Sequence, residues 1–140
     1  MKYTIIDHTA DFAVEFYGKT IPELFENSAV SLSEIIFEKP VINQQIGALD
    51  LSFSTDSIEI NYIDFLREIL YHINQNYFHF YECHAQLISD TALTIKCSYV
   101  QMTKNDIIHE IKAVTYHECG IKDKIKNKQK IYYAKVTFDI

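Results

Sequence analysis

The chain has 140 residues, of which 48% are hydrophobic and 23% charged, and its formal net charge is −6. This length predicts a single domain, residues 1–140, that can bury a core without disulfides. The acidic balance argues against strong direct binding of nucleic acid, which basic surfaces favour. Three cysteines without a C-x-x-C pair disfavour both a disulfide framework and a structural zinc site. With no membrane-spanning run and an early charged residue, we expect a cytoplasmic protein that has no membrane partner.

Two short strands, residues 3–6 and 11–17, are expected around a polar cluster near the start of the chain. Thr20 and Glu23 then stand three residues apart, as in a capping box, and predict the start of a helix that ends before Pro40. Alternating apolar residues at 49–53 indicate a half-buried strand.

A second helix is expected from about Ser57 to Asn76, because its apolar residues recur at three- and four-residue spacing. Further strands are expected at residues 78–88, 93–99, 109–119 and 131–140. Two helices among about seven strands, many joined as hairpins, predict an α+β fold. We expect a two-layer sandwich, with two main helices packed on a mostly antiparallel β-sheet.

The last strand alternates cleanly between apolar and polar residues. One face carries Tyr132, Ala134, Val136, Phe138 and Ile140. This alternation predicts that Asp139 points away from the core and that Ile140 anchors the end of the strand.

The polar cluster Asp7-His8-Thr9-Ala10-Asp11 is the first candidate site. If the final strand lies beside the first, Asp139 and the terminal carboxylate of Ile140 join Asp7 and Asp11. Carboxylates that converge in this way need a cation, because like charges destabilise one another. The alternative is that these residues cap turns and strand ends.

A second constellation lies at His109–His117, where His109, Thr115 and His117 would share one strand face with Ile111 and Ala113. Such a face is either a polar strand edge or a protein-contact surface. Lysines alternate with other residues from Lys122 to Lys130, and this pattern has two interpretations. The lysines form a solvated hairpin or loop that protects a sheet edge, or they contact RNA or an acidic partner.

No phosphate-cradling glycine loop and no nucleophile elbow occurs in the sequence, which argues against an enzyme. The motifs Asp7-His8-Thr9-Ala10-Asp11, His109-x4-Ala113-Val114-Thr115-Tyr116-His117 and Phe138-Asp139-Ile140 together resemble those of the archease family. They span nearly the whole chain, in the order that the family shows. The chain departs from the family pattern at Ala13, where glycine is usual.

The resemblance implies an accessory protein that activates an RtcB-type RNA ligase. Such a ligase is guanylylated on its own histidine before it joins RNA ends in tRNA splicing or RNA repair, and archease-like proteins promote this step and restore turnover. The resemblance further implies that a divalent metal ion is held by Asp11, Asp139 and the carboxylate of Ile140. Carboxylate oxygens suit a hard cation such as calcium or magnesium. Contacts to the partner or to the ligands are expected from Asp7, His8, Thr9, His109 and His117.

Two other functions remain open on the sequence. A small metal-dependent hydrolase would use Asp7, His8, Asp11 and Asp139 around an open metal position. A general chaperone-like module would suppress aggregation of many proteins without any need for Asp139.

Overall fold

The computed structural model describes residues 1–7, 12–37, 45–115 and 120–140, with Asp7 described by its backbone alone. The elements follow one another as β1 (Tyr3–Asp7), β2 (Phe12–Gly18), α1 (Ile21–Phe37), β3 (Ile46–Ser54), α2 (Ile58–Asn76), β4 (Phe78–Ser89), β5 (Ala92–Gln101), the short 3-10 helix η1 (Lys104–Asp106), β6 (Ala113–Thr115), β7 (Lys122–Lys126) and β8 (Gln129–Asp139). The expected α+β class is confirmed, because two helices pack on antiparallel strands.

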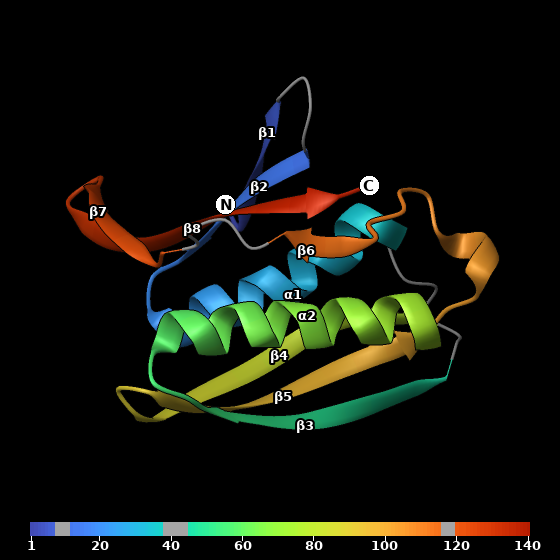
Figure 1. Ribbon diagram of the computed structural model, residues 1–140, viewed down its shortest axis with the longest axis horizontal. Helices are drawn as coiled ribbons and strands as arrows, with labels where there is room; N and C mark the ends of the chain where they lie inside the picture. Colours follow the sequence, from blue (N-terminus) through green and yellow to red (C-terminus); the bar gives the residue numbers. More distant parts are fainter. Residues whose placement is uncertain (8–11, 38–44, 116–119) are drawn as a thin grey trace.

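The strands form two separate antiparallel sheets. The first has the order β1-β2-β8-β6, with β7 also paired to β8, and the second has the order β3-β5-β4. Figure 1 shows both helices between the two sheets, and α1 contacts β2 of the first sheet and β4 of the second. Accordingly, α1 is buried around most of its circumference, as expected of a helix with sheets on two sides. Neither helix of the described ranges has the length and apolarity needed to cross a membrane.

Side chains cap both helices where the sequence predicted their starts. The Ser57 hydroxyl accepts the Ile60 amide at 3.1 Å and begins α2. At α1, the Thr20 hydroxyl accepts the Glu23 amide at 3.1 Å. The Glu23 carboxylate reaches back to the amide of Lys19 at 3.3 Å, one residue before the cap. These bonds satisfy amides that the first helical turn leaves unpaired.

Gly18 permits the sharp passage from β2 into α1. A Cβ at this position would lie 2.7 Å from the Cα of Leu24, closer than real contacts allow. The end of β2 therefore meets the first turn of α1 backbone to backbone.

Hydroxyl groups connect α1 to its neighbours within the core. The Ser33 Oγ accepts the buried amide of Phe80 at 2.9 Å, which ties α1 to β4. The Ser28 Oγ lies 2.7 Å from the Tyr62 hydroxyl of α2. The buried Ser31 Oγ, in contrast, has no hydrogen-bond partner among the described residues.

Two buried thiols face each other inside the three-stranded sheet. Cys83 of β4 is the direct cross-strand partner of Cys97 of β5, and both are free and buried. The hydrogen bond that the Cys83 thiol donates to the Cys97 sulfur, together with burial, raises the pKa of the Cys83 thiol. Both cysteines are thus core residues of the three-stranded sheet.

The chain between β5 and β8 differs from the expectation of one strand over residues 109–119. Strand β6 contains only Ala113–Thr115, and the residues before it run as irregular chain from η1. The lysine-rich segment is itself a strand, β7, which forms a hairpin with the start of β8. The segment is therefore an exposed hairpin, and whether its lysines contact RNA or an acidic partner is a separate question.

Candidate metal and partner site

The sheet register brings the first and last motifs of the chain to one end of the five-stranded sheet. Asp7 pairs with Phe12, and Phe12 pairs with Phe138. Strand neighbours are separated by about 4.8 Å, so the backbones of Asp7 and Phe138 lie roughly 10 Å apart across β2. Asp7 and Phe12, the described residues on either side of 8–11, thus lie at the sheet end where β8 terminates.

Asp139 occupies the last ladder position of β8, opposite Ala113 of β6. Its carbonyl oxygen accepts the amide of Lys112 at 2.8 Å, while its side chain is exposed. Phe138 beside it is 1% exposed. The expectation that Asp139 points away from the core is therefore confirmed.

Ile140 was expected to anchor the end of β8, and this expectation is wrong. Its side chain is 67% exposed, because it follows the last ladder pair and no described element covers it.

The other motif residues lie largely outside the described residues. His8, Thr9, Asp11 and His117 belong to this group, and Asp7 is described by its backbone alone. Within the described ranges, no three His, Cys, Asp or Glu residues gather as a metal-binding group. The exposed carboxylate of Asp139 is a hard oxygen donor of the type that calcium or magnesium accepts.

His109 does not share a strand face with Ile111 and Ala113. Both His109 and Ala113 are exposed, whereas Ile111 is 1% exposed. The amides of Ile108 and His109 donate to the carbonyl of Ile36 at 2.8 and 3.3 Å, so this backbone bonds to the end of α1 instead of a ladder. The expectation of a histidine face was therefore wrong at His109, and His117 lies outside the described residues.

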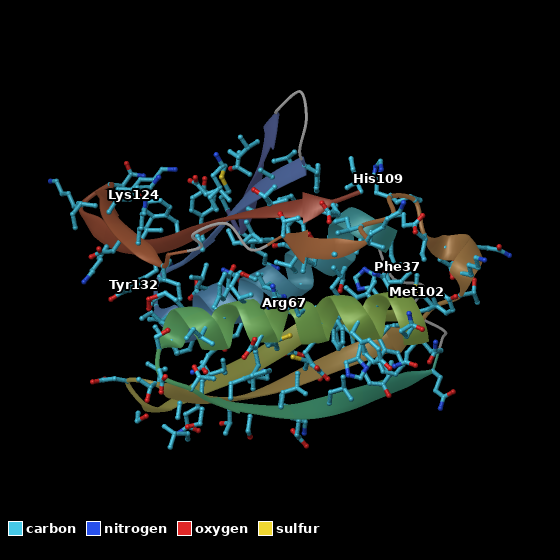
Figure 2. The ribbon with its side chains drawn as sticks, in the orientation of Figure 1. Phe37, Arg67, Met102, His109, Lys124 and Tyr132 are labelled. Atoms are coloured by element: carbon cyan, nitrogen blue, oxygen red, sulfur yellow. The ribbon has the colours of Figure 1, made fainter. Side chains whose placement is uncertain are left out.

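A groove between α2 and β6, with both polar and apolar lining residues, was not anticipated from the sequence. It has a volume of about 290 Å³ and is lined by Arg67, Tyr71, Asn74 and Lys112, among others. The Asn74 side chain donates to the carbonyl of Ile111 at 2.9 Å and holds the two walls together. Figure 2 shows Arg67 on α2.

The groove adjoins the candidate site, since the amide of Lys112 is bonded to Asp139. The α2 residues Arg67, Tyr71 and Asn74, which line the groove, are spaced four and three positions apart. They therefore lie on one side of the helix, next to its apolar face. Tyr71 is 58% exposed on this side, and an exposed aromatic at that spacing was the signal that could have revealed the groove.

The chain is similar to known proteins over its whole length. Residues 3–140 match the model of the archease protein family. Protein archease of Archaeoglobus fulgidus is 28% identical over the full length of both chains. Protein archease of Methanosarcina barkeri is 30% identical over 86% of each chain.

Two solved structures share the fold. The solution structure of Methanobacterium thermoautotrophicum protein 1598 matches with a TM-score of 0.73 and 19% identity, over 99% of both chains. The crystal structure of an archease from Thermotoga maritima, described as a possible chaperone, matches with a TM-score of 0.56 and 22% identity. This match covers 96% of the present chain and 94% of the other. The family model, which accounts for nearly every residue, decides the relationship, and the chain belongs to the archease family.

Proposed function

We propose that this chain is a cytoplasmic accessory protein, not itself an enzyme, that activates an RtcB-type RNA ligase. In this role it promotes guanylylation of the ligase and sustains its turnover in tRNA splicing or RNA repair. Membership of the archease family supports the proposal. The observation that carries it is the sheet register, by which residues far apart in sequence, Asp7 and Asp139, lie at the same end of one sheet, on the two strands that flank β2.

The proposed working group is a divalent cation held by Asp11, Asp139 and the carboxylate of Ile140. Two adjacent carboxylates at the end of β8 repel each other unless a cation neutralises them. Oxygen donors of this kind select calcium or magnesium over softer metals. When bound, the cation supplies a positive centre that acidic or phosphate groups can approach.

The groove beside this strand end suits contact with the ligase. Arg67 and Tyr71 are residue types that dominate the binding energy of protein interfaces. Lys112 forms the opposite wall and is bonded through its amide to Asp139. A partner that enters the groove therefore also reaches the proposed cation, so docking and metal binding are linked.

The test is multiple-turnover ligation by an RtcB-type ligase with GTP and a divalent metal, with and without this protein. Transfer of labelled guanylate to the ligase is measured in parallel. We expect the parent chain to accelerate both steps and Asp139→Ala to abolish the acceleration. Asp50→Ala, which removes an exposed carboxylate from β3, is the matched control and retains it. Full activation by Asp139→Ala would refute the proposed site, and no activation by the parent chain would refute the proposed partner.

A general chaperone is the second candidate, because the Thermotoga maritima archease is described as a possible chaperone. This function predicts that the chain suppresses aggregation of several unrelated heated proteins, equally well with Asp139→Ala. If suppression occurs and ligation is unaffected, the chaperone function replaces the ligase proposal.

A further inference from the structure

A basic hollow lies at the end of the five-stranded sheet opposite the candidate metal site. Its volume is about 390 Å³, and its lining includes Lys2, Tyr17, Lys19, Asn27, Lys126 and Asn127. It is formed where β2 passes into α1 and where the β7–β8 hairpin turns. Figure 2 shows Lys124 and Tyr132 of this hairpin at one end of the long axis, far from His109.

Three ammonium groups in the hollow lack a counter-ion within the described part of the chain. Lys2, Lys19 and Lys126 form no ion pair with any described residue, whereas Lys124 and Lys130 are paired with Glu15 and Asp123. The single carboxylate of the lining, that of Glu23, accepts the amide of Lys19 at 3.3 Å. The first turn of α1, capped by Thr20, adds the positive end of its dipole. In a chain of net charge −6, this hollow is a local excess of positive charge.

The hairpin turn presents lysine where the backbone favours other residues. Asn127 and Lys128 have φ of 53° and 64°, so both central residues adopt the left-handed conformation of a type I′ turn. Asparagine tolerates this conformation, but glycine is preferred at the second position. Asn127 lines the hollow, so this turn forms part of its wall.

A line of ammonium groups leads from the hollow along β7. Lys122, Lys124 and Lys126 alternate with Asp123 and Ile125, so they share one face of the strand. Alternate strand residues are about 6.6 Å apart, a spacing close to that of successive phosphates in an extended nucleic-acid strand. All residues of β7 are exposed, so these charges are accessible.

Tyrosines lie on the same face as these lysines. Tyr133 is the cross-strand partner of Lys122, and the Lys124 Nζ lies 4.6 Å from the Tyr133 ring centroid and 5.6 Å from that of Tyr17. Lysines interleaved with aromatic rings are typical of surfaces that bind single-stranded nucleic acid, where phosphates meet charge and bases stack on rings.

We propose that this end of the molecule binds single-stranded nucleic acid. One backbone phosphate occupies the hollow between Lys2, Lys19 and Lys126, and the neighbouring phosphates follow Lys124 and Lys122 along β7. The overall negative charge of the chain makes this binding weak and strongly dependent on salt. The proposal does not depend on the ligase as partner, because it uses a different end of β8.

The test measures the fluorescence anisotropy of a labelled oligouridine of about 12 nucleotides titrated with the full chain. Titrations at about 50 mM and about 200 mM salt give the salt dependence of the affinity. We expect Lys19→Gln/Lys126→Gln to weaken binding by about tenfold at the lower salt. The salt slope falls by about 0.7, since both lysines contact the same phosphate and each single-strand phosphate contact contributes about 0.7.

The matched control is Lys96→Gln/Lys104→Gln, which removes two exposed lysines from β5 and η1 and leaves the affinity unchanged. Circular dichroism verifies that both double variants fold. Three outcomes overturn the proposal: no binding by the parent chain, equal weakening by both double variants, or competition by polyglutamate as strong as that by unlabelled oligouridine. If uridine monophosphate competes as well as the oligomer, only one phosphate is bound, and the proposed binding of further phosphates along β7 is wrong. Competition by the oligomer alone, lost in the Lys19/Lys126 variant, supports the whole assignment.

Discussion

The amide of Lys112 donates to the carbonyl oxygen of Asp139 at 2.8 Å, next to the ladder pair that joins Ala113 to Asp139. The backbone at the end of β8 is therefore held by its neighbour strand while the carboxylate faces solvent. A side chain presented in this way can be changed with little effect on the fold, which separates tests of function from tests of stability.

Asp139→Ala is expected to change the free energy of unfolding of the metal-free protein by no more than about 0.5 kcal/mol, as usual for an exposed side chain. Loss of one oxygen donor is expected to weaken calcium binding by more than about tenfold. Isothermal titration calorimetry and urea unfolding measure the two quantities. Asp50→Ala serves as control for a general loss of negative charge, and equal calcium affinity in parent and Asp139→Ala would remove Asp139 from the site.

A few residues added after Ile140 are expected to abolish calcium binding and ligase activation, because the added peptide bond replaces a charged carboxylate with a neutral carbonyl. Ile140→Ala keeps the carboxylate, and its 67% exposed side chain contributes little packing. This variant is expected to bind calcium normally and to lose at most about 0.5 kcal/mol of stability. The comparison is made by calorimetry and ligation with both variants, and normal activity of the extended chain would exclude the carboxylate of Ile140 as a ligand.

Two serines of α1 are expected to respond oppositely to alanine. Ser33→Ala removes the acceptor of the buried Phe80 amide and is expected to cost about 1–3 kcal/mol. The buried Ser31 Oγ has no hydrogen-bond partner among the described residues, and alanine is the better helix former. Ser31→Ala is expected to stabilise the chain by about 0.5 kcal/mol. Urea unfolding measures the free energy of unfolding of both variants. A loss of more than about 1 kcal/mol for Ser31→Ala would show that its hydroxyl has a hydrogen-bond partner.

Glu26→Gln is expected to raise Tm at pH 7 and to have little effect near pH 4. Burial raises the pKa of the Glu26 carboxyl, even though its Oε2 accepts the Ala85 amide at 2.7 Å. A raised pKa in the folded state means that stability present at low pH is lost as pH rises through that pKa. The amide oxygen of glutamine accepts the same hydrogen bond without a charge. Thermal melts from pH 4 to 7 test this, with Glu34→Gln, on the exposed side of α1, as control; a gain that is independent of pH would contradict the assignment.

Residues with a local pattern were predictable from the sequence. The apolar stripe of α2 predicted its position from about Ser57 to Asn76, and the alternation of β8 predicted the outward direction of Asp139. In each case, one short stretch contains both the signal and its consequence.

Non-local partners explain what could not be predicted. The chain before β6 bonds to the carbonyl of Ile36 at the end of α1, and no spacing around His109 encodes this contact. The division into two sheets depends on strand pairings over long separations, as of β2 with β8. The basic hollow joins Lys2, Lys19 and Lys126, which are distant in sequence, so only the lysines of β7 were visible as a pattern.

The facing thiols of Cys83 and Cys97 have a kinetic consequence. Alkylation requires an accessible thiolate, and both burial and the raised pKa of Cys83 suppress that species in the closed sheet. In a Cys119→Ser background, the rate of maleimide labelling therefore reports how often β4 separates from β5. Comparison of that rate with global unfolding would show whether the three-stranded sheet opens as an independent cooperative unit or only with the rest of the molecule.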